Sequence, residues 1–360
     1  MSSPEVIPVT LLTGFLGSGK TTVLNYLIRV LPRTAVLMNE FGEVGLDHLL
    51  LEKMQGPLAL LAGGCICCTV SGNLAPSLKN LYVARQKGEV PAFERAVIET
   101  TGIADPAPIL DVLLHDKWLR ARFQLDGVVT TVDAVLGAQQ LDGYFEAVRQ
   151  VAVADRLLLT KVDLADDAGR AALEGRLRAL NPAAPILQVR QGWLDASEIF
   201  GLGLYEPASK TPDVRGWLKD SRYASVRRNA LGQVRQADAA AENHDSRIRA
   251  FSIALDTPIS RLGLESALAM LASFRSEYLL RFKAIVNVAG EDPPSVLHGV
   301  QHVLYPEAKL ACWPDGDRRS RFVFIVRDLD PAFVAKVLAD FTDAAEELLP
   351  PQVVEKENRP

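Results

Sequence analysis

The sequence predicts an α/β protein with a doubly wound, mostly parallel sheet, followed by a smaller α+β domain. Apolar runs without strict polar alternation recur through the first half of the chain, separated by helical stretches, which is typical of strands covered on both faces. A glycine-rich loop of the phosphate-binding type follows the first of these runs. Beyond residue 247 the pattern changes to an alternating strand, further strands and two helices, which indicates a separate α+β unit.

The first unit is predicted over residues 1–200, and its elements follow from the apolar pattern. Strands are expected at 6–12, 34–40, 95–100, 126–134, 155–163 and 184–190, with a helix over 20–30. Right-handed strand–helix–strand connections are the default topology for such a series. A chain of 360 residues agrees with two domains of about 100–200 residues each.

Residues 201–247 break this pattern, because they are polar, mixed in charge and without regular apolar spacing. We interpret them as a linker. The second domain is expected over 248–348, with residues 349–360 as a tail. Its predicted elements are a strand at 247–256, a helix at 261–281, strands at 282–289, 296–304 and 321–327, and a helix at 331–347.

Composition excludes several classes of protein. The formal net charge of −5 argues against a broad nucleic-acid footprint, and no apolar run approaches the ~18 residues needed to span a bilayer. The first residues lack a basic segment followed by a cleavable apolar one, so no secretory signal is expected. Four cysteines, three of them clustered, do not form a disulfide framework. We expect a cytoplasmic protein with reduced thiols that binds neither nucleic acid nor a membrane.

A phosphate-binding loop is predicted at GFLGSGKT, which begins at Gly14 between the first strand and the first helix. The letters fit the P-loop pattern G-x-x-x-x-G-K-[ST], in the strand–loop–helix context that the motif requires. Glycines let backbone N–H groups surround phosphate oxygens, and the helix N-terminus adds a favourable dipole. Lys20 would reach the β- and γ-phosphates, and the Thr21 hydroxyl would bind Mg²⁺. A flexible glycine-rich turn is the alternative, and the agreement of motif with context argues against it.

The base is predicted to be guanine, from the residues TKVD at 160–163. At such a strand end, the Asp163 carboxylate would accept hydrogen bonds from guanine N1 and N2, where adenine has no matching donors. Lys161 would pack along the base. Asparagine is the commoner first residue of this motif, so Thr160 is expected to weaken the anchoring of the loop. ATP is the alternative nucleotide.

Carboxylates for Mg²⁺ and the attacking water are predicted after the second and third strands. The segment NEFGEVGLD offers Glu40, Glu43 and Asp47 where a nucleotide-sensing loop would lie. Glu99 ends the third strand, where it could hold Mg²⁺ directly or through water, and Gly102 could direct a backbone N–H at the γ-phosphate. Helix capping is the alternative role for these acids. No water-orienting glutamine or arginine finger is identified, so intrinsic hydrolysis is expected to be slow.

A C-x-C-C motif is formed by Cys65, Cys67 and Cys68. Soft thiolates suit Zn²⁺ and similar thiophilic ions. Three such ligands leave a fourth position for water, for Glu43 or for a residue of a partner, and an open shell suits metal transfer. Inert burial and a redox role are the alternatives. Cys312 is distant in sequence and is assigned to core packing.

Taken together, the motifs GFLGSGKTT, NEFGEVGLD, GGCICC, ETTG with ADPAPI, and TKVD resemble the CobW-type GTPases, related to HypB and UreG, and in detail the YjiA branch. The match covers about residues 5–345. The resemblance implies a P-loop GTPase metallochaperone that binds Zn²⁺ or Co²⁺ and delivers it to a client metalloprotein. The nucleotide contacts that it implies are Gly14, Gly17, Ser18, Gly19, Lys20, Thr21, Thr22, Lys161 and Asp163, with Lys20, Glu99 and Gly102 in catalysis. The implied metal ligands are Cys65, Cys67 and Cys68 for zinc, and Thr21, Glu40, Asp47 and Glu99 for Mg²⁺.

Three features depart from this family or add to it. Many members carry a histidine-rich stretch before the second domain, where this chain has only NHDS with His244. The family's R-x-K-G is RFKA at 281–284, so any tight turn at Ala284 is expected to differ. His298 and His302 have a spacing that could bind metal on a helix, but a packed or partner-facing helix or strand pair is the preferred interpretation.

These observations predict a two-state carrier. GTP and Mg²⁺ would order residues 40–47, which lead along the chain toward the cysteines, so metal affinity and nucleotide state would be linked. Hydrolysis would loosen the loop and release the metal. A metal-sensing switch that controls a partner without delivering metal is the first alternative, and a P-loop kinase with an unrelated zinc site is the second. The physiological metal, the client and the question of a homo-oligomer stay open.

Overall fold

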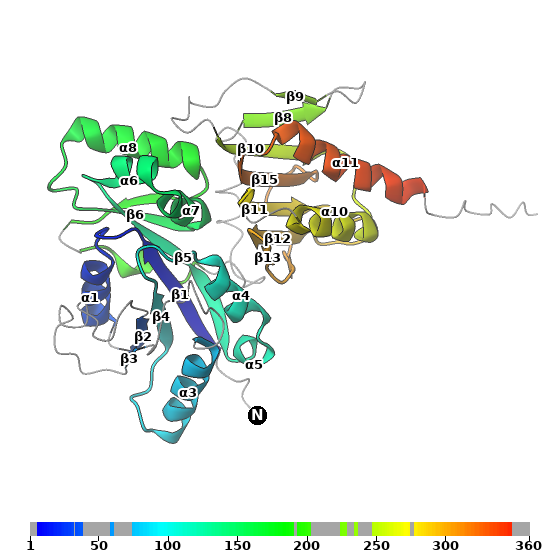
Figure 1. Cartoon of the computed structure of the whole chain (residues 1–360). Helices are drawn as coiled ribbons and strands as arrows, with labels where there is room; N and C mark the ends of the chain where they lie inside the picture. The colour runs from blue at the N-terminus through cyan, green and yellow to red at the C-terminus, as the bar shows by residue number, and fades with distance from the viewer. Residues whose placement is uncertain are drawn as a thin grey trace, which may run out of the picture.

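The computed structural model describes residues 6–31, 33–38, 58–60, 74–190, 193–202, 224–228, 234–236, 247–273 and 277–347. Within this part of the chain, two sheets with their helices lie side by side (Figure 1). The predicted fold class, a doubly wound parallel sheet followed by a smaller α+β domain, is confirmed. No helix in this part of the chain is both long and apolar enough to cross a membrane.

The first domain has a seven-stranded parallel sheet within the described residues, in the order β3-β2-β4-β1-β5-β6-β7. Its strands are β1 (Ile7–Gly14), β2 (Thr34–Met38), β3 (Leu58–Leu60), β4 (Arg95–Glu99), β5 (Phe123–Asp133), β6 (Arg156–Thr160) and β7 (Ile186–Gln188). Strands β4 and β5 flank β1, so the carboxyl ends of all three meet at one edge of the sheet. That edge carries the candidate site.

Helices cover both faces of this sheet. They are α1 (Lys20–Val30), α3 (Leu74–Lys87), α4 (Ala107–His115), α5 (Lys117–Arg120), α6 (Gly137–Gly143), α7 (Phe145–Val153) and α8 (Asp167–Leu180), with a short 3₁₀ helix at Ala196–Glu198. In β1, Val9 and Leu11 pack with α3 and α4, whereas the next residue, Leu12, packs with α1. This two-sided burial explains why the strand is a continuous apolar run in the sequence.

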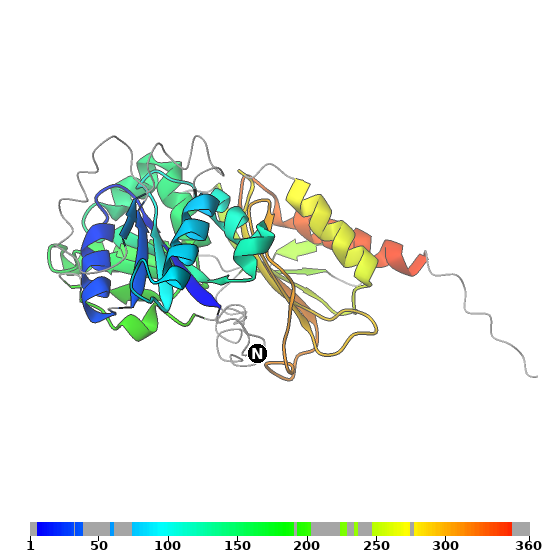
Figure 2. The ribbon, with the colours of Figure 1, turned by 90° about the horizontal axis from the view of Figure 1, so that it is seen from below.

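The second domain is built on a mostly antiparallel sheet in the order β13-β12-β11-β15-β10-β8-β9, with β14 beside β12. Helices α10 (Arg261–Ser273) and α11 (Pro331–Glu347) lie together on one side of it (Figure 2). The strands are β8 (Ala224–Arg228), β9 (Val234–Gln236), β10 (Ile248–Leu255), β11 (Leu279–Val286), β12 (Ser295–Val300), β13 (Val303–Leu304), β14 (Ala308–Lys309) and β15 (Ser320–Arg327).

The second domain differs from the sequence prediction in several elements. The strand expected over 296–304 is divided by a turn into β12 and β13, and β14 was not expected. Strands β8 and β9 lie inside the expected linker, residues 201–247, and β8 pairs with β10, so they extend the second sheet. The helix expected over 261–281 ends at Ser273, and 279–281 belong to β11. The strands β8 and β9 are short, and the start of β11 contains a charge. Their strand character is therefore hidden when the sequence is considered alone. The tail at 349–360 lies outside the described residues.

Single residues of the second domain also bear on the expectations. Ala284 lies in the middle of β11, so the RFKA segment forms no turn. Cys312 is exposed rather than part of the core. His298 is buried in β12 and His302 is exposed in the turn that follows, so the two do not share a helix face. The packed interpretation of His298 is confirmed, and His244 lies outside the described residues.

Strands β11, β12 and β15 of the second sheet are buried on both faces, because the side away from α10 and α11 packs on helices of the first domain. In β11, Phe282 and Ala284 face α10 and α11, whereas Arg281 and Lys283 alternate with them and face the first domain. Apolar residues of the second domain that join the clusters around α4, α7 and α8 are Ile248, Leu280, Val300, Val303, Tyr305 and Ile325. The interface is therefore continuous with the core of the first domain.

A buried ion cluster lies within this interface. Asp155 accepts hydrogen bonds from the Arg281 guanidinium, from Lys283 Nζ at 3.2 Å and from the backbone N–H of Val128 at 3.0 Å. Burial opposes ionisation of Asp155, but attraction to Arg281 and Lys283 outweighs it and holds its pKa well below the usual range. Burial, together with repulsion from the same two cations, lowers the pKa of His298, which is therefore neutral.

Candidate nucleotide-binding site

The predicted phosphate loop connects β1 to α1, as the motif requires. Three of its glycines have positive φ: 145° at Gly14, 71° at Gly17 and 89° at Gly19. Residues other than glycine rarely adopt this backbone region. A Cβ at Gly14 would lie 2.2 Å from Thr131 Oγ1 and 2.5 Å from the Thr131 carbonyl oxygen. The loop therefore has space only for backbone at this point, which fits close wrapping of a phosphate.

Two polar side chains fix the shape of the loop. Lys20 is nearly buried, and its ammonium donates to the carbonyl oxygens of Gly14 at 2.9 Å and Phe15 at 3.2 Å. The Ser18 and Thr131 hydroxyls are 2.6 Å apart, which ties the loop to β5. Thr21 is half-buried and Thr22 is exposed in the first turn of α1. The ammonium and the helix N-terminus thus gather positive charge at this edge of the sheet.

Glu99 occupies the predicted position for a metal-binding acid. It ends β4, pairs in register with Leu12 of β1, and is 4% exposed. The following residue, Thr100, donates its hydroxyl to Thr13 Oγ1 at 2.8 Å, directly before the phosphate loop. Oxygen donors from Thr21 and Glu99 are the chemistry that Mg²⁺ prefers. The residues present therefore fit a Mg²⁺–nucleotide complex held at this edge.

Gly102 lies against the backbone of the phosphate loop. A Cβ on Gly102 would come within 2.6 Å of the Leu16 nitrogen and 2.8 Å of its Cα. Only glycine permits this approach, because the neighbouring atoms are main-chain atoms that cannot rotate away. The structure thus brings the predicted Gly102 beside the loop that would hold the phosphates.

The guanine motif follows β6, with Lys161 in the left-handed region at φ 56° and Asp163 exposed. The Thr160 hydroxyl donates to the Ser18 carbonyl at 2.7 Å, so it tethers the motif to the phosphate loop. Thr160 therefore supplies an anchoring hydrogen bond of its own, and weaker anchoring than with asparagine stays a prediction. Lys161 Nζ lies 2.6 Å from Oδ2 of Asp133.

Sequence reasoning missed the contribution of Asp133. Its carboxylate is fully buried, pairs with Lys161 and accepts the backbone N–H groups of Val135 and Leu136. In the sequence this residue is only one position of the predicted strand at 126–134. The available signal was an acid at the end of a predicted parallel strand. That strand, β5, lies between β1 and β6 in the sheet. Asp133 holds Lys161 in place and so shapes the base-binding side of the site.

Several predicted ligands lie outside the described residues. These are the carboxylates Glu40, Glu43 and Asp47 and the thiols Cys65, Cys67 and Cys68. Within the described ranges, no group of three or more His, Cys, Asp or Glu side chains is arranged to hold a metal ion. The zinc site stays a prediction from the sequence.

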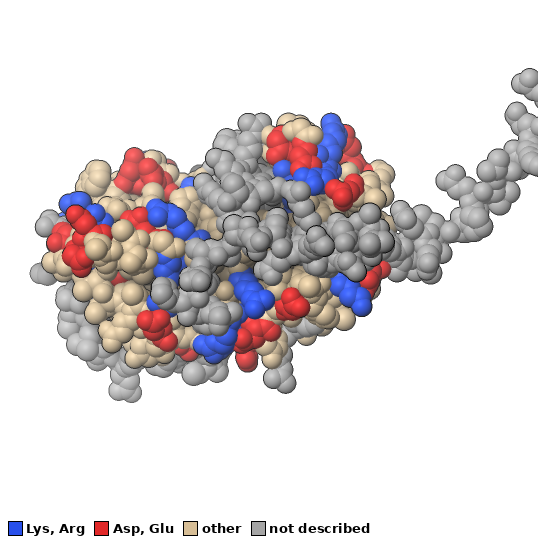
Figure 3. All heavy atoms as spheres, turned by 90° about the horizontal axis from the view of Figure 1, so that it is seen from above, with Lys and Arg blue, Asp and Glu red and all other residues tan. Residues whose placement is uncertain are grey.

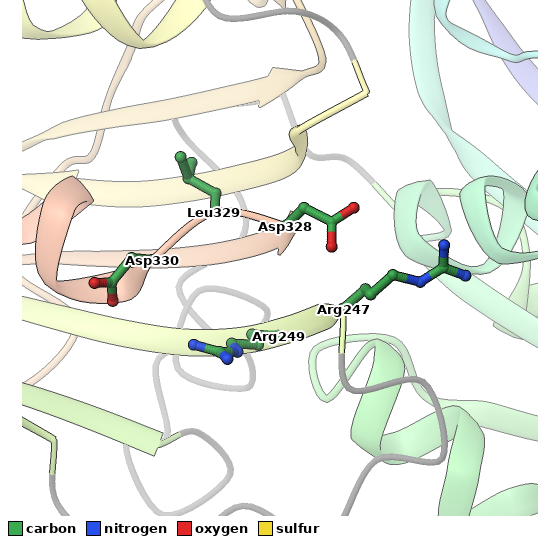
Figure 4. A pocket seen from close by; sticks show the side chains of 5 residues that line it. All are labelled: Arg247, Arg249, Asp328, Leu329 and Asp330. Atoms are coloured by element: carbon green, nitrogen blue, oxygen red, sulfur yellow. The ribbon is translucent and has the colours of Figure 1, made fainter.

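The second domain has a hollow that differs in chemistry from the loop region. Its described lining includes Arg247 and Arg249 at the start of β10 and Asp328 and Asp330 beyond β15 (Figure 4). Because two cations and two carboxylates line this hollow, its charge gives it no preference for an anion. On the face shown in Figure 3, basic and acidic side chains are likewise interspersed over the part drawn in colour. The carboxyl edge of the first sheet is therefore the candidate site.

Comparison with known proteins agrees with this geometry. Residues 8–188 match the family model of the CobW/HypB/UreG nucleotide-binding domain, and residues 248–342 match the cobalamin synthesis protein cobW C-terminal domain. The zinc chaperone YjiA of Escherichia coli is 34% identical over 321 residues, which cover 89% of this chain and 93% of YjiA. The zinc-regulated GTPase metalloprotein activator 1 of Schizosaccharomyces pombe is 37% identical over 218 residues, which cover 57% of this chain and 51% of that protein.

Among solved structures, the crystal structure of Zn(II)-bound YjiA GTPase from Escherichia coli superposes with a TM-score of 0.68 at 28% identity. The match covers 93% of this chain and 99% of that one, so it includes both domains. With both family models in order along one chain, this protein belongs to the CobW/HypB/UreG family and carries the CobW type of C-terminal domain.

Proposed function

We propose that the protein is a GTPase that binds Zn²⁺ at its C-x-C-C motif and passes it to client metalloproteins under the control of the nucleotide. The observation that carries this proposal is the place where the strand before the motif ends. Strand β3 ends at Leu60, five residues before Cys65, at the same edge of the parallel sheet as the phosphate loop and Glu99. The names of the relatives, a zinc chaperone and a metalloprotein activator, support the same function.

In this proposal the phosphate loop holds the β- and γ-phosphates. Lys20 moves its ammonium from the Gly14 and Phe15 carbonyls to the phosphate oxygens, and backbone N–H groups of the loop supply further donors. Thr21 and Glu99, with Glu40 and Asp47 from the sequence prediction, would hold Mg²⁺, which neutralises charge on the transferred phosphoryl group.

Hydrolysis by this site is proposed to be slow. The NH₂ group of the buried Gln150 donates to the carbonyl oxygens of Gly102 and Ala104, so it holds this segment in place. The residues around the phosphate loop fix the shape of that loop. A slow intrinsic rate would suit a carrier that keeps its metal until a client binds.

Selectivity for guanine is expected to depend on Asp163. In an Asp163→Asn variant, the amide would present a donor where guanine N1 also donates, so GTP affinity should fall by about 10–100-fold while ATP affinity changes little. Competition between fluorescent GDP and unlabelled GTP or ATP measures both affinities. The exposed Asp167→Asn substitution in α8 is the matched control, and it should leave both unchanged. Equal displacement by ATP and GTP in the native protein would contradict the assignment of the base.

Zinc affinity is expected to depend on the three clustered thiols. Replacing Cys65, Cys67 and Cys68 by serine removes the soft ligands, so the affinity for Zn²⁺ should fall by at least about 100-fold. Competition with a chromophoric chelator at pH 7 measures the affinity and the number of zinc ions bound. Cys312→Ser is the control, because that thiol is exposed and distant in sequence. Unchanged affinity in the triple variant would place the zinc elsewhere.

Delivery is tested with the apo form of a zinc enzyme as acceptor. The proposal predicts that the zinc-loaded protein with GTP restores activity of the acceptor faster than free zinc buffered at the same activity. Transfer that is no faster, combined with nucleotide-dependent binding of a partner, would favour the metal-sensing switch instead.

A further inference from the structure

The loop between β4 and α4, residues 100–106, contacts both the phosphate loop and the second domain. At its start, Gly102 lies against the backbone of Leu16, where an added Cβ would be 2.6 Å from nitrogen. At its end, Asp105 lies beside the turn between β12 and β13 of the second domain. One short segment therefore spans from the candidate site to the domain interface. We refer to it as the 100–106 loop.

The Asp105 carboxylate is held by groups from three elements. Ala107 at the start of α4 donates its N–H at 3.0 Å, and Arg149 of α7 forms an ion pair at 2.9 Å. The side-chain amide of Gln301 in the second domain lies 3.0 Å from both carboxylate oxygens. Two of these groups come from the first domain, so Gln301 is the contact through which the second domain reaches Asp105.

The other part of the 100–106 loop is fixed by α7. Gln150 is 1% exposed, and its amide donates to the carbonyl oxygens of Gly102 at 3.1 Å and Ala104 at 3.2 Å. Because Arg149 and Gln150 are neighbours on one helix, α7 and Gln301 together determine where the loop lies. A shift of Gly102 against the phosphate loop would have to move these contacts as well.

Gln301 itself is held in an unusual backbone conformation. Its φ is 54°, in the left-handed region that favours glycine, and the residue is 3% exposed. Its N–H donates to the Leu280 carbonyl at 3.2 Å, and the neighbouring Val300 and Val303 pack into the cluster around α4. A conformation of this kind persists where the surroundings determine it, and it is found preferentially at functional positions. The turn thus presents the amide rigidly to Asp105.

We propose that Gln301 is a positioning residue for GTP hydrolysis: by holding Asp105 it fixes the 100–106 loop, and with it Gly102, against the phosphate loop. This inference rests on the proposed GTPase function. Because Gln301 belongs to the second domain, the same contact transmits nucleotide state to that domain. The coupling must be reciprocal, so whatever shifts the second domain also changes the loop beside the γ-phosphate.

The test compares substitutions at Gln301 in the full chain. Gln301→Ala should lower kcat for GTP hydrolysis about tenfold, and Gln301→Glu should lower it further, because a second carboxylate would face Asp105. KM for GTP should change less than about twofold, since the phosphate loop is untouched. His302→Ala alters the exposed neighbour in the same turn and should behave as the native protein. Thermal unfolding midpoints distinguish these effects from loss of fold.

An exchanged pair provides the rescue. Asp105→Asn combined with Gln301→Glu restores a carboxylate–amide contact in the opposite direction. The asparagine introduced at position 105 can keep the contact to the Ala107 N–H, because its amide oxygen is an acceptor. The double variant should recover part of the activity lost in Gln301→Glu, because the asparagine gives up the ion pair with Arg149. A double variant slower than both single variants would mean that the two residues act separately, which contradicts the inference.

Hydrogen exchange gives a readout that does not need hydrolysis. Amides of 295–305 should exchange differently with a GTP analogue and with GDP in the native protein, and this difference should disappear in Gln301→Ala. If the native protein binds GTP without hydrolysing it, the proposed GTPase function is contradicted. Hydrogen exchange would still show whether Gln301 transmits the nucleotide state to the second domain. Exchange that is independent of nucleotide, or a native kcat in Gln301→Ala, would overturn the role of Gln301.

Discussion

Replacing Asp155 by asparagine is expected to lower the free energy of unfolding by about 3–5 kcal/mol. The variant leaves Arg281 and Lys283 buried at the domain interface without a compensating charge, although asparagine keeps the size of the side chain and an acceptor for Val128. Urea unfolding followed by tryptophan fluorescence measures the loss. If the two domains separate at their interface before they unfold, the lost stability will be seen as a first transition at a lower urea concentration.

The control for this substitution is an exposed aspartate with a single ion pair. Asp167 pairs with Arg170 in α8, and its side chain is 92% exposed, so Asp167→Asn should cost less than about 1 kcal/mol. Asp155→Asn that is no more destabilising than Asp167→Asn would contradict the role of the buried cluster. Replacing Asp155, Arg281 and Lys283 together by apolar residues should recover much of the loss, because no buried charge is then unpaired.

The same cluster predicts a dependence of stability on pH. Burial raises the pKa of Asp155, but Arg281 and then Lys283 outweigh it, so the pKa is lowered in the folded protein. The stabilising effect of the carboxylate is therefore complete above the ordinary aspartate pKa of about 3.9 and is lost as the pH falls through the lower native value. Below about pH 4, the native protein should lose stability more steeply than Asp155→Asn does.

Replacing Gly102 by alanine is expected to lower kcat for GTP hydrolysis by at least about 100-fold. The new Cβ would be placed 2.6 Å from the Leu16 nitrogen, so either the 100–106 loop or the phosphate loop must move. Such a movement would displace the groups that are proposed to face the γ-phosphate, and the loss of one well-placed donor in comparable sites reduces kcat by about 10²–10³. Single-turnover phosphate release measures the chemical step.

Gly175→Ala is the matched control for this change. Gly175 is exposed in α8, and an added Cβ there meets nothing within 4 Å. This variant should hydrolyse GTP at the native rate and gain up to about 1 kcal/mol of stability, since alanine favours the helix. Native hydrolysis by Gly102→Ala would show that the contact with Leu16 does not matter for catalysis.

Much of the fold was predictable because local patterns coincide with it. The helices at 20–30 and 331–347 have the predicted bounds, since each begins at a clear signal, the end of the phosphate loop or Pro331. The strands of the first sheet other than β3 were found as apolar runs that helices cover on both faces, whereas the three residues of β3 were missed. The overextended helix at 261–281 was wrong because the apolar residues that follow α10 fit a helix as well as a strand.

The domain interface was not predictable, because its partners are distant in the chain. Arg281 and Asp155 are 126 residues apart, and the sequence prediction placed Arg281 at the end of a helix where the structure has a strand. The motif residues of the candidate site were named from the sequence, whereas the contacts that support them in the fold were not. The contacts of Asp133 with Lys161 and of Thr160 with the Ser18 carbonyl both depend on which strands are neighbours in the sheet. Strand order is a property of the whole fold, and single motifs do not encode it.

The central claim is that nucleotide state controls zinc affinity. Linkage of this kind has a coupling of roughly 5–150-fold in known systems and acts equally in both directions. In this protein the expected sign is tighter zinc binding with GTP, because GTP would order the segment at 40–47 that leads toward the cysteines. Zinc, in turn, should tighten the binding of GTP by the same factor.

The decisive measurement is of zinc dissociation constants at pH 7, obtained by chelator competition with a non-hydrolysable GTP analogue and with GDP. We expect zinc to bind at least about fivefold more tightly in the GTP-analogue state. We also expect this difference to be lost in the variant with serine at Cys65, Cys67 and Cys68 and retained in Cys312→Ser. Equal zinc affinity in the two nucleotide states would contradict the central claim.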